Sequence, residues 1–124
     1  MKKRIIDINE DGIKLEDGYS ITHYHEQDCC EKVYAHWQYL KDFLCFDKSD
    51  EFYIELDLNK IIVPVTSAGF RIEIEAFWTS NEYFVPCYDI QNGYYSDNLK
   101  LQLKKGNKVI QELDISQTTI YQEQ

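Results

Sequence analysis

The stretch RIIDINEDGIKLEDGYSITHYH, residues 4–25, decides the fold of this 124-residue chain. Asp-Gly favours tight hairpin turns because both residues tolerate a positive φ, and this stretch contains it twice. The runs that these turns separate are rich in strand-forming residues and cover Arg4–Asn9, Ile13–Glu16 and Tyr19–His25. We therefore predict a three-stranded antiparallel meander at the start of the chain.

Beyond residue 25 the spacing of apolar residues lengthens from two to about 3.6, which is the period of a helix. One helical stripe is formed by Cys30, Val33, Trp37, Leu40 and Leu44, and Tyr34 and Cys45 widen it. Asp28 stands at the N-cap position, and Glu31 follows three residues later, as in a capping box. We predict one amphipathic helix from about Cys29 to Cys45.

Strand patterns return after this helix. Alternation covers Phe52–Leu58, Phe70–Trp78 and Leu99–Leu103, and Trp78 falls on the apolar side of its run. A further strand is predicted at Val109–Ile115. Ile61–Val65 and Tyr83–Ile90 each contain a proline, which favours an edge strand or a bulge. Tight turns are predicted at Gln91-Asn92-Gly93 and Lys105-Gly106-Asn107.

The full pattern predicts a single α+β domain over residues 1–124. It comprises a mainly antiparallel β-sheet of about six to eight strands, starting with the meander, and one amphipathic helix packed on a face. The polar residues 117–124 are expected to form a frayed tail.

The charge balance narrows the choice of partner. Thirteen basic residues stand against 22 acidic ones, giving a formal net charge of -9. Such a chain repels nucleic acid and anionic membranes and fits a basic protein partner. The sequence has neither an apolar run typical of an export signal nor one typical of a membrane helix, so a cytoplasmic protein with reduced cysteines is expected.

Side chains of the metal-binding kind gather in HYHEQDCCE, residues 23–31. His23 and His25 fall on one side of the third predicted strand, close to Cys29 and Cys30 at the start of the predicted helix. Imidazole nitrogens and thiolates are ligands that zinc prefers. However, adjacent helical residues point about 100° apart, and zinc-binding cysteines usually have a gap between them. The ligand types thus favour a zinc site, whereas the spacing of the cysteines opposes it. We keep a zinc site as one interpretation of these residues.

Two other interpretations fit the same residues. Cys29 or Cys30 at a helix N-terminus could act as a nucleophile with a nearby histidine as base, although Glu26, Asp28 and Glu31 oppose thiolate formation. Alternatively, the carboxylates cap the helix and Cys30 is a small core residue. The capping interpretation is the one that we favour. We accordingly expect no cofactor and no enzymatic activity, with zinc as the alternative.

Two further groups of residues are candidates for contact with a partner. Pairs of carboxylates share strand faces at a spacing of about 6.6 Å, an arrangement that suits a basic partner and is also common on solvated sheets. Tyrosines surround the turn at residues 91–93, either as a contact surface or as cross-strand packing. The predicted interaction surface consists of Glu55, Asp57, Glu73, Glu75, Tyr88, Tyr94 and Tyr95.

Two segments resemble a family of small uncharacterised bacteriophage and prophage proteins with a His-x-x-Asp-Cys-Cys-Glu motif. The first is His25–Glu31 with Val33 and Tyr34, and the second runs from Gly69 through Pro86-Cys87-Tyr88 to Tyr94-Tyr95-Ser96. In the family an Asp often follows the helical alanine, where this chain has His36. The resemblance implies no named activity. It implies a phage context, in which short acidic proteins often bind and block host machinery.

Taken together, the sequence predicts a non-enzymatic interaction module in the host cytoplasm. Its expected partner is a host, defence or phage protein, with a basic one fitting the charge best and with no direct contact to nucleic acid or membrane. A homo-oligomer is the alternative assembly. The alternative function is a zinc-binding or thiol-dependent protein that uses His23, His25, Cys29 and Cys30.

Overall fold

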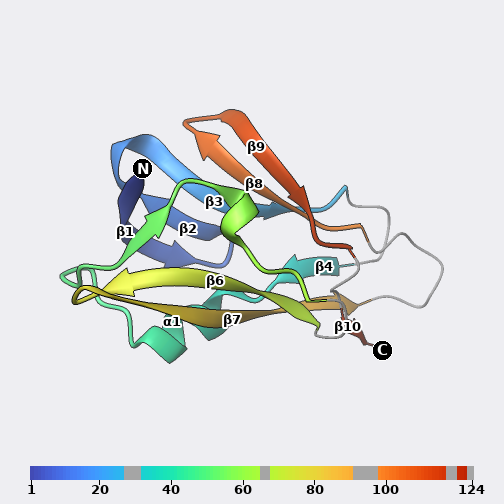
Figure 1. Cartoon of the computed structure of the whole chain (residues 1–124). Coiled ribbons are helices and arrows are strands. Elements are labelled where there is room, and N and C mark those ends of the chain that lie inside the picture. The colour runs from blue at the N-terminus through green and yellow to red at the C-terminus, as the bar shows by residue number, and fades with distance from the viewer. Residues whose placement is uncertain (27–31, 65–67, 91–97, 117–119, 123–124) are drawn as a thin grey trace.

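The computed structural model describes residues 1–26, 32–64, 68–90, 98–116 and 120–122 (Figure 1). Its strands form a ten-stranded sheet in the order β10-β7-β6-β5-β1-β2-β3-β8-β9, with β4 paired to β7 outside this path. In this part of the chain, every strand pairing except that of β10 with β7 is antiparallel. The predicted α+β class, a sheet-dominated fold with one α-helix in the described residues, is confirmed.

The N-terminal meander forms as predicted. It consists of β1 (Lys2–Asn9), β2 (Gly12–Leu15) and β3 (Tyr19–Tyr24). The first turn is held by the side chain of Asn9, whose Oδ1 accepts hydrogen bonds from the backbone N–H groups of Asp11 at 2.8 Å and Gly12 at 3.2 Å. A Cβ on Gly12 would lie 2.1 Å from the carbonyl oxygen of Ile21, so only glycine fits where β2 meets β3.

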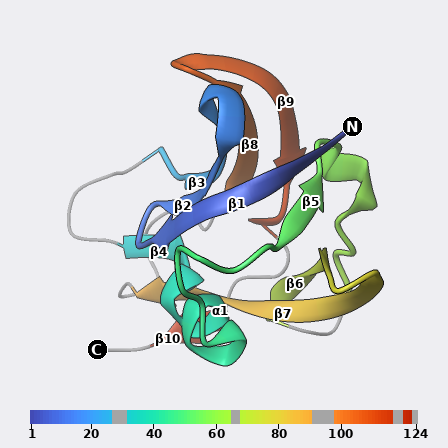
Figure 2. The same cartoon turned by 90° about the vertical axis from the view of Figure 1, so that its left-hand side faces the viewer.

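The remaining strands fold the sheet into two layers (Figure 2). On one side of the meander, β8 (Lys100–Lys105) pairs with β3, and β9 (Lys108–Asp114) pairs with the other edge of β8. On the other side, β5 (Tyr53–Glu55) links β1 to β6 (Gly69–Ala76), which pairs with β7 (Thr79–Ile90). The layer of β6 and β7 therefore faces the layer of β1, β2, β3, β8 and β9.

The core fills the space between these layers. Alternation along each strand directs one row of side chains inward, and burial of that row is the main stabilising contribution. The buried side chains of the two layers include Ile5, Ile8, Ile13, Ile21, Phe70, Ile72, Ile74, Val85, Leu99 and Leu101.

The predicted helix Cys29–Cys45 is wrong over its first part. Lys32–Ala35 forms strand β4, and the helix α1 covers only Trp37–Leu44. Val33 and Ala35 are buried while Tyr34 faces outward, which is the alternation of a strand. Residues 32–35 pair with residues 87–90 of β7, more than fifty positions away, and this tertiary pairing outweighs the local helical spacing.

The N-cap of α1 therefore also differs from the prediction. His36 occupies that position, and its Nδ1 accepts a hydrogen bond from the backbone N–H of Tyr39 at 3.3 Å. The predicted capping residues Asp28 and Glu31 lie outside the described residues. Within α1 the predicted stripe is correct, since Trp37 and Leu40 are buried and Leu44 packs against the core.

Pro86 lies where β7 exchanges one partner strand for another. Gly69↔Pro86 is the last pair between β6 and β7, and Ala35↔Cys87 is the first between β4 and β7. Proline has no N–H to donate to a ladder, but its carbonyl oxygen accepts a hydrogen bond from the backbone N–H of His36 at 2.8 Å. The irregularity predicted for this proline thus appears as a change of partner within a long strand.

The segments around Trp78 and at the C-terminal end also differ from the prediction. The strand predicted to continue to Trp78 ends at Ala76, and Phe77-Trp78 form the turn to β7, with Trp78 97% exposed. In the segment predicted as a frayed tail, β10 (Ile120–Gln122) pairs in parallel with Tyr88–Ile90. Among the described residues, no helix has both the length and the apolar character needed to cross a membrane.

Candidate functional site

Of the two histidines of the predicted zinc site, His23 lies on β3 and His25 directly follows it. Each forms a hydrogen bond through its Nδ1. Nδ1 of His23 accepts the indole N–H of Trp37 at 2.8 Å, and the two rings are stacked with centroids 6.4 Å apart. Burial lowers the pKa of His23, so the neutral ring is favoured. A neutral imidazole that accepts at Nδ1 carries its proton on Nε2.

This tautomer restricts metal binding at His23. Nδ1 accepts the hydrogen bond from Trp37, and Nε2 carries a proton. His23 could therefore bind zinc only by losing either that hydrogen bond or that proton. His25 is arranged differently, because its Nδ1 lies 2.5 Å from the carbonyl oxygen of Asn98, which makes Nδ1 the donor. Histidines that bind metals commonly donate their second N–H to a carbonyl in this way.

The two cysteines of the predicted zinc site, Cys29 and Cys30, lie outside the described residues. Within the described ranges, no group of three or more His, Cys, Asp or Glu side chains is arranged to hold a metal ion. The zinc or thiol function therefore stays a prediction, and His25 is the residue whose hydrogen bonding suits it better.

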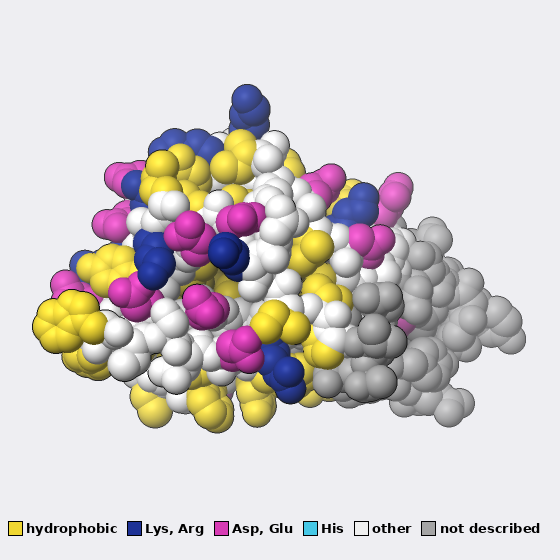
Figure 3. Space-filling view, in the orientation of Figure 1, with side chains coloured by type: hydrophobic (Ala, Val, Ile, Leu, Met, Phe, Trp, Pro, Cys, Tyr) yellow, Lys and Arg dark blue, Asp and Glu magenta, His cyan; other side chains and the backbone are white. Residues whose placement is uncertain are grey.

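The predicted acidic residues do gather in space, around a hollow of about 260 Å³ between β5 and β6. Glu55, Asp57 and Glu73 line its rim together with Lys2 and Lys60. Figure 3 looks onto this face, where dark-blue and magenta side chains surround yellow ones. The floor consists of Ile21, Ile54, Ile61 and Ile72. We call this feature the front hollow.

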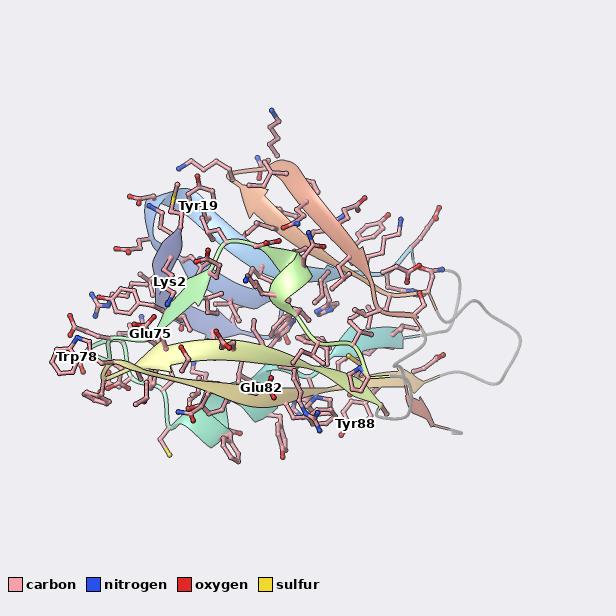
Figure 4. The ribbon with its side chains drawn as sticks, in the orientation of Figure 1. Lys2, Tyr19, Glu75, Trp78, Glu82 and Tyr88 are labelled. Carbon is pink, nitrogen blue, oxygen red and sulfur yellow. The ribbon has the colours of Figure 1, made fainter. Side chains whose placement is uncertain are left out.

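The rim of the front hollow is of mixed charge. Lys2 pairs with Glu75 beside the hollow, and this hydrogen bond raises the pKa of the Lys2 ammonium (Figure 4). Asp57 accepts hydrogen bonds from the side-chain amide of Gln111 at 3.1 Å and the backbone N–H of Asn59 at 3.0 Å, which lower its pKa. The structure thus brings the predicted carboxylates together but interleaves them with lysines, so they do not form a uniformly acidic face.

Of the predicted tyrosines, Tyr88 is described and Tyr94 and Tyr95 lie outside the described residues. Tyr88 faces outward from β7 between buried Cys87 and Asp89, directly opposite Tyr34 of β4. The rings of Tyr34 and Tyr88 lie 5.6 Å apart, and the ring of His36 lies 5.8 Å from Tyr88. This group is the start of a larger aromatic surface.

That surface continues onto α1. The ring of Tyr39 lies 6.4 Å from His36 and 6.4 Å from Phe43, whose own ring contacts Tyr83 of β7 at 5.9 Å. Tyr39 and Phe43 are one helical turn apart and lie outside the buried stripe of α1. The contacts form an unbroken series, which we call the aromatic strip: Tyr34, His36, Tyr39, Phe43, Tyr83 and Tyr88.

The aromatic strip is open to solvent along α1 and partly covered on the strands. Phe43 is 66% exposed and Tyr39 is 44% exposed, while Tyr34, Tyr83 and Tyr88 are half-buried. Burial raises the pKa of Tyr34, so its hydroxyl stays protonated at neutral pH. At the β4 end, the ammonium of Lys32 lies 4.7 Å from the centre of the Tyr34 ring, a cation–π contact. Large exposed aromatic areas of this kind are typical of binding surfaces.

Sequence reasoning found only Tyr88 of this strip. The predicted helix placed Tyr34 on a buried helical stripe, whereas β4 turns it outward. Tyr39 and Phe43 do carry a signal in the sequence, since they are aromatic, four residues apart and outside the apolar stripe. No protein-family model, curated protein sequence or solved structure matches this chain.

Proposed function

We propose that this protein is a non-catalytic interaction module that binds a basic partner protein through the aromatic strip. The observation that carries the proposal is the unbroken series of ring contacts across β4, α1 and β7. The resemblance to phage proteins supports a bacterial host or phage protein as the partner and the host cytoplasm as the location.

The composition and order of the strip support this role. Tyrosine and other aromatic residues are enriched at protein interfaces, since they combine a large apolar area with a polar tip. Rings that already touch one another, such as Tyr34 with Tyr88 and Tyr39 with Phe43, lose little side-chain freedom when a partner covers them. The strip is therefore ordered for binding before a partner arrives.

The charge of the protein supports a basic partner. A net charge of -9 attracts a positively charged protein over long range, which raises the rate of encounter. The apolar contact with the strip then holds the complex together. Association by this route should slow as salt is added, while the dissociation rate changes little.

The zinc-binding or thiol-dependent function remains the second candidate. One observation favours it, which is that Nδ1 of His25 donates to the carbonyl oxygen of Asn98, the orientation that metal-binding histidines commonly show. Native mass spectrometry of protein purified without chelator tests it. A stoichiometric zinc mass that disappears when Cys29 and Cys30 are changed to serine would establish this function.

The interaction proposal is tested by comparing three forms of the protein as bait in a bacterial lysate. The test variant is Tyr39→Ser with Phe43→Ser, which removes the exposed centre of the strip. The control is Val109→Ser with Ile110→Ser, which removes exposed apolar side chains on β9, at 39% and 47% exposure. We expect basic proteins captured by wild type and control but lost with the strip variant. Equal capture by all three forms would contradict the proposal.

A further inference from the structure

The hairpin between β6 and β7 ends in two exposed aromatic residues. Ala76 pairs with Thr79, which leaves Phe77 and Trp78 as a two-residue turn. Their side chains are 87% and 97% exposed, and Trp78 stands at the far end of the molecule (Figure 4). Neither ring is covered by its own chain.

This turn is also conformationally unusual. Phe77 has a φ of 52° and Trp78 a φ of 64°, and positive values at both positions are those of a type I′ turn. Asn-Gly is strongly preferred there, because most side chains are strained at positive φ. Phe77 and Trp78 therefore occupy a strained turn without the compensation of burial. Strain held at an exposed site points to a role outside the isolated chain.

The front hollow has the size to receive the Trp78 ring. Its volume is about 260 Å³, and its floor is made of isoleucine side chains. A cavity of about 150 Å³ lined by apolar side chains already holds benzene, so an indole ring fits in the front hollow. In Figure 3 the hollow opens on the face of the molecule that is turned to the viewer, and the hairpin tip projects beyond the edge of that face.

The rim of the front hollow matches the polar features of an indole. The carboxylates of Glu55 and Glu73 are acceptors for the indole N–H, which a buried tryptophan needs. The ammonium of Lys60, which also lines the hollow, is a cation that can contact the face of the ring. The residues next to the tip, Ala76 and Thr79, are uncharged, so a charged rim does not repel them.

We propose that Trp78 of one copy of this protein inserts into the front hollow of a second copy. Glu73 lies on β6, three residues before the strand ends at Ala76 and the Trp78 turn begins, which is roughly 10 Å at about 3.3 Å per residue. Two copies related by a two-fold axis can therefore exchange tips, with their β6–β7 hairpins running in opposite directions. The result is a closed dimer with the same contact made twice.

This dimer and the complex with a basic partner respond to salt in opposite ways. Two copies that each carry a net charge of -9 repel one another, so added salt strengthens the dimer. Salt weakens the encounter with a basic partner. The tip and the aromatic strip share no residues, so the failure of one proposal leaves the other standing.

The first experiment measures mass by sedimentation over a range of protein and salt concentrations. We expect a dimer whose dissociation constant rises by about tenfold or more in Trp78→Ser. Ile110→Ser, which removes another exposed apolar side chain, should leave it unchanged. A wild-type protein that stays monomeric throughout, or a Trp78→Ser variant that dimerises equally well, would overturn the proposal.

A second pair of variants tests the hollow itself. Glu73→Trp places a ring at the mouth of the hollow in its own chain. Glu82→Trp is the matched control, because Glu82 pairs with Glu73 across the ladder but does not itself line the hollow. Dimerisation should be lost only with Glu73→Trp. Mixing Glu73→Trp, which has an intact tip, with Trp78→Ser, which has an intact hollow, should restore a dimer. A mixture that stays monomeric would contradict insertion of the tip.

A small molecule that mimics the Trp78 side chain tests whether the front hollow itself binds an indole ring. N-acetyl-tryptophanamide at millimolar concentration should shift the backbone NMR signals of Ile54, Ile72 and Glu73 in the Trp78→Ser variant. The same signals should not shift in Glu73→Trp combined with Trp78→Ser. Absence of shifts in both variants, or binding of the wild-type tip to zwitterionic lipid vesicles without any dimer, would overturn the proposal.

Discussion

Trp37 at the start of α1 donates its indole N–H to Nδ1 of His23 on β3 across 2.8 Å. The bond satisfies the polar atom of a tryptophan that is only 1% exposed, and its ring also packs edge-on against Phe70 of β6 at 5.6 Å. One side chain thereby connects the helix to both layers of the sheet. His23 belongs to the segment of the sequence that is richest in metal-binding side chains, yet in the structure it stabilises the packing of Trp37.

This relationship predicts a dependence of stability on pH. Burial lowers the pKa of folded His23 below its ordinary value of 6.5, so the unfolded chain binds a proton first as the pH falls. The stabilisation is complete above about pH 6.5 and is lost as the pH falls toward the lowered folded pKa. Urea denaturation of wild type between about pH 7.5 and about pH 5 should show this loss.

The matched variant for this measurement is His23→Gln. Glutamine keeps an acceptor for the Trp37 N–H but does not titrate in this range. The difference in unfolding free energy between wild type and His23→Gln should shrink as the pH is lowered. A difference that is constant across the range would show that folding leaves the pKa of His23 unchanged.

The hairpin tip predicts a gain in stability from removing its aromatic residues. Phe77→Asn with Trp78→Gly supplies the residues that a type I′ turn prefers, and relief of the strain at positive φ should raise the unfolding free energy by about 1–2 kcal/mol. Phe77→Ala with Trp78→Ala removes the rings but keeps the strain, so it should be no more stable than wild type. Equal stability of both double variants would show that the turn is not strained.

Substitutions on the two faces of α1 should differ sharply in their effect on the unfolding free energy. Tyr39→Ser with Phe43→Ser alters exposed side chains, and each change should shift the unfolding free energy by about 0.5 kcal/mol or less. Leu40→Ala on the same helix opens a cavity beneath a fully buried side chain and should cost about 2–5 kcal/mol. Thermal and urea denaturation measure both. A large loss in the serine variant would mean that the strip stabilises the fold rather than a complex.

The cysteines offer a test of the thiol alternative. Cys45 is exposed and Cys87 is fully buried, so a thiol reagent should label native Cys45 readily and Cys87 about a thousandfold or more slowly. Mass spectrometry of peptides from briefly labelled protein assigns the sites. Reaction at Cys29 or Cys30 faster than at Cys45 would support the thiol-dependent function over the interaction module.

The sequence was informative where structure depends on neighbouring residues. The meander and the β8–β9 hairpin follow from alternation and from turn signals such as Asp11-Gly12, which ends the first turn, and Gly106-Asn107, whose effect is local. Alternation also identified most of the buried positions of β6, including Phe70, Ile72 and Ile74. These features are predictable because each is determined within a few residues.

Features that depend on distant pairing were missed. Residues 32–35 become a strand only because residues 87–90 lie beside them, and the helical spacing of Val33 and Trp37 gives no sign of it. The alternation of apolar residues in the sequence of β6 likewise continues to Trp78, but the chain reverses direction at Phe77-Trp78. The aromatic strip could not be assembled from the sequence because its members come from three elements that meet only in the fold.

The aromatic strip is the central claim, and photo-crosslinking from within it is the most direct test. The photoreactive amino acid p-benzoylphenylalanine replaces Phe43 in one form and exposed Ile110 in a control form, each expressed in bacterial cells. We predict a discrete heavier adduct from position 43 that contains a basic protein, and no such adduct from position 110. Irradiation that gives no adduct at position 43, or the same adducts at both positions, would contradict a binding role for the strip.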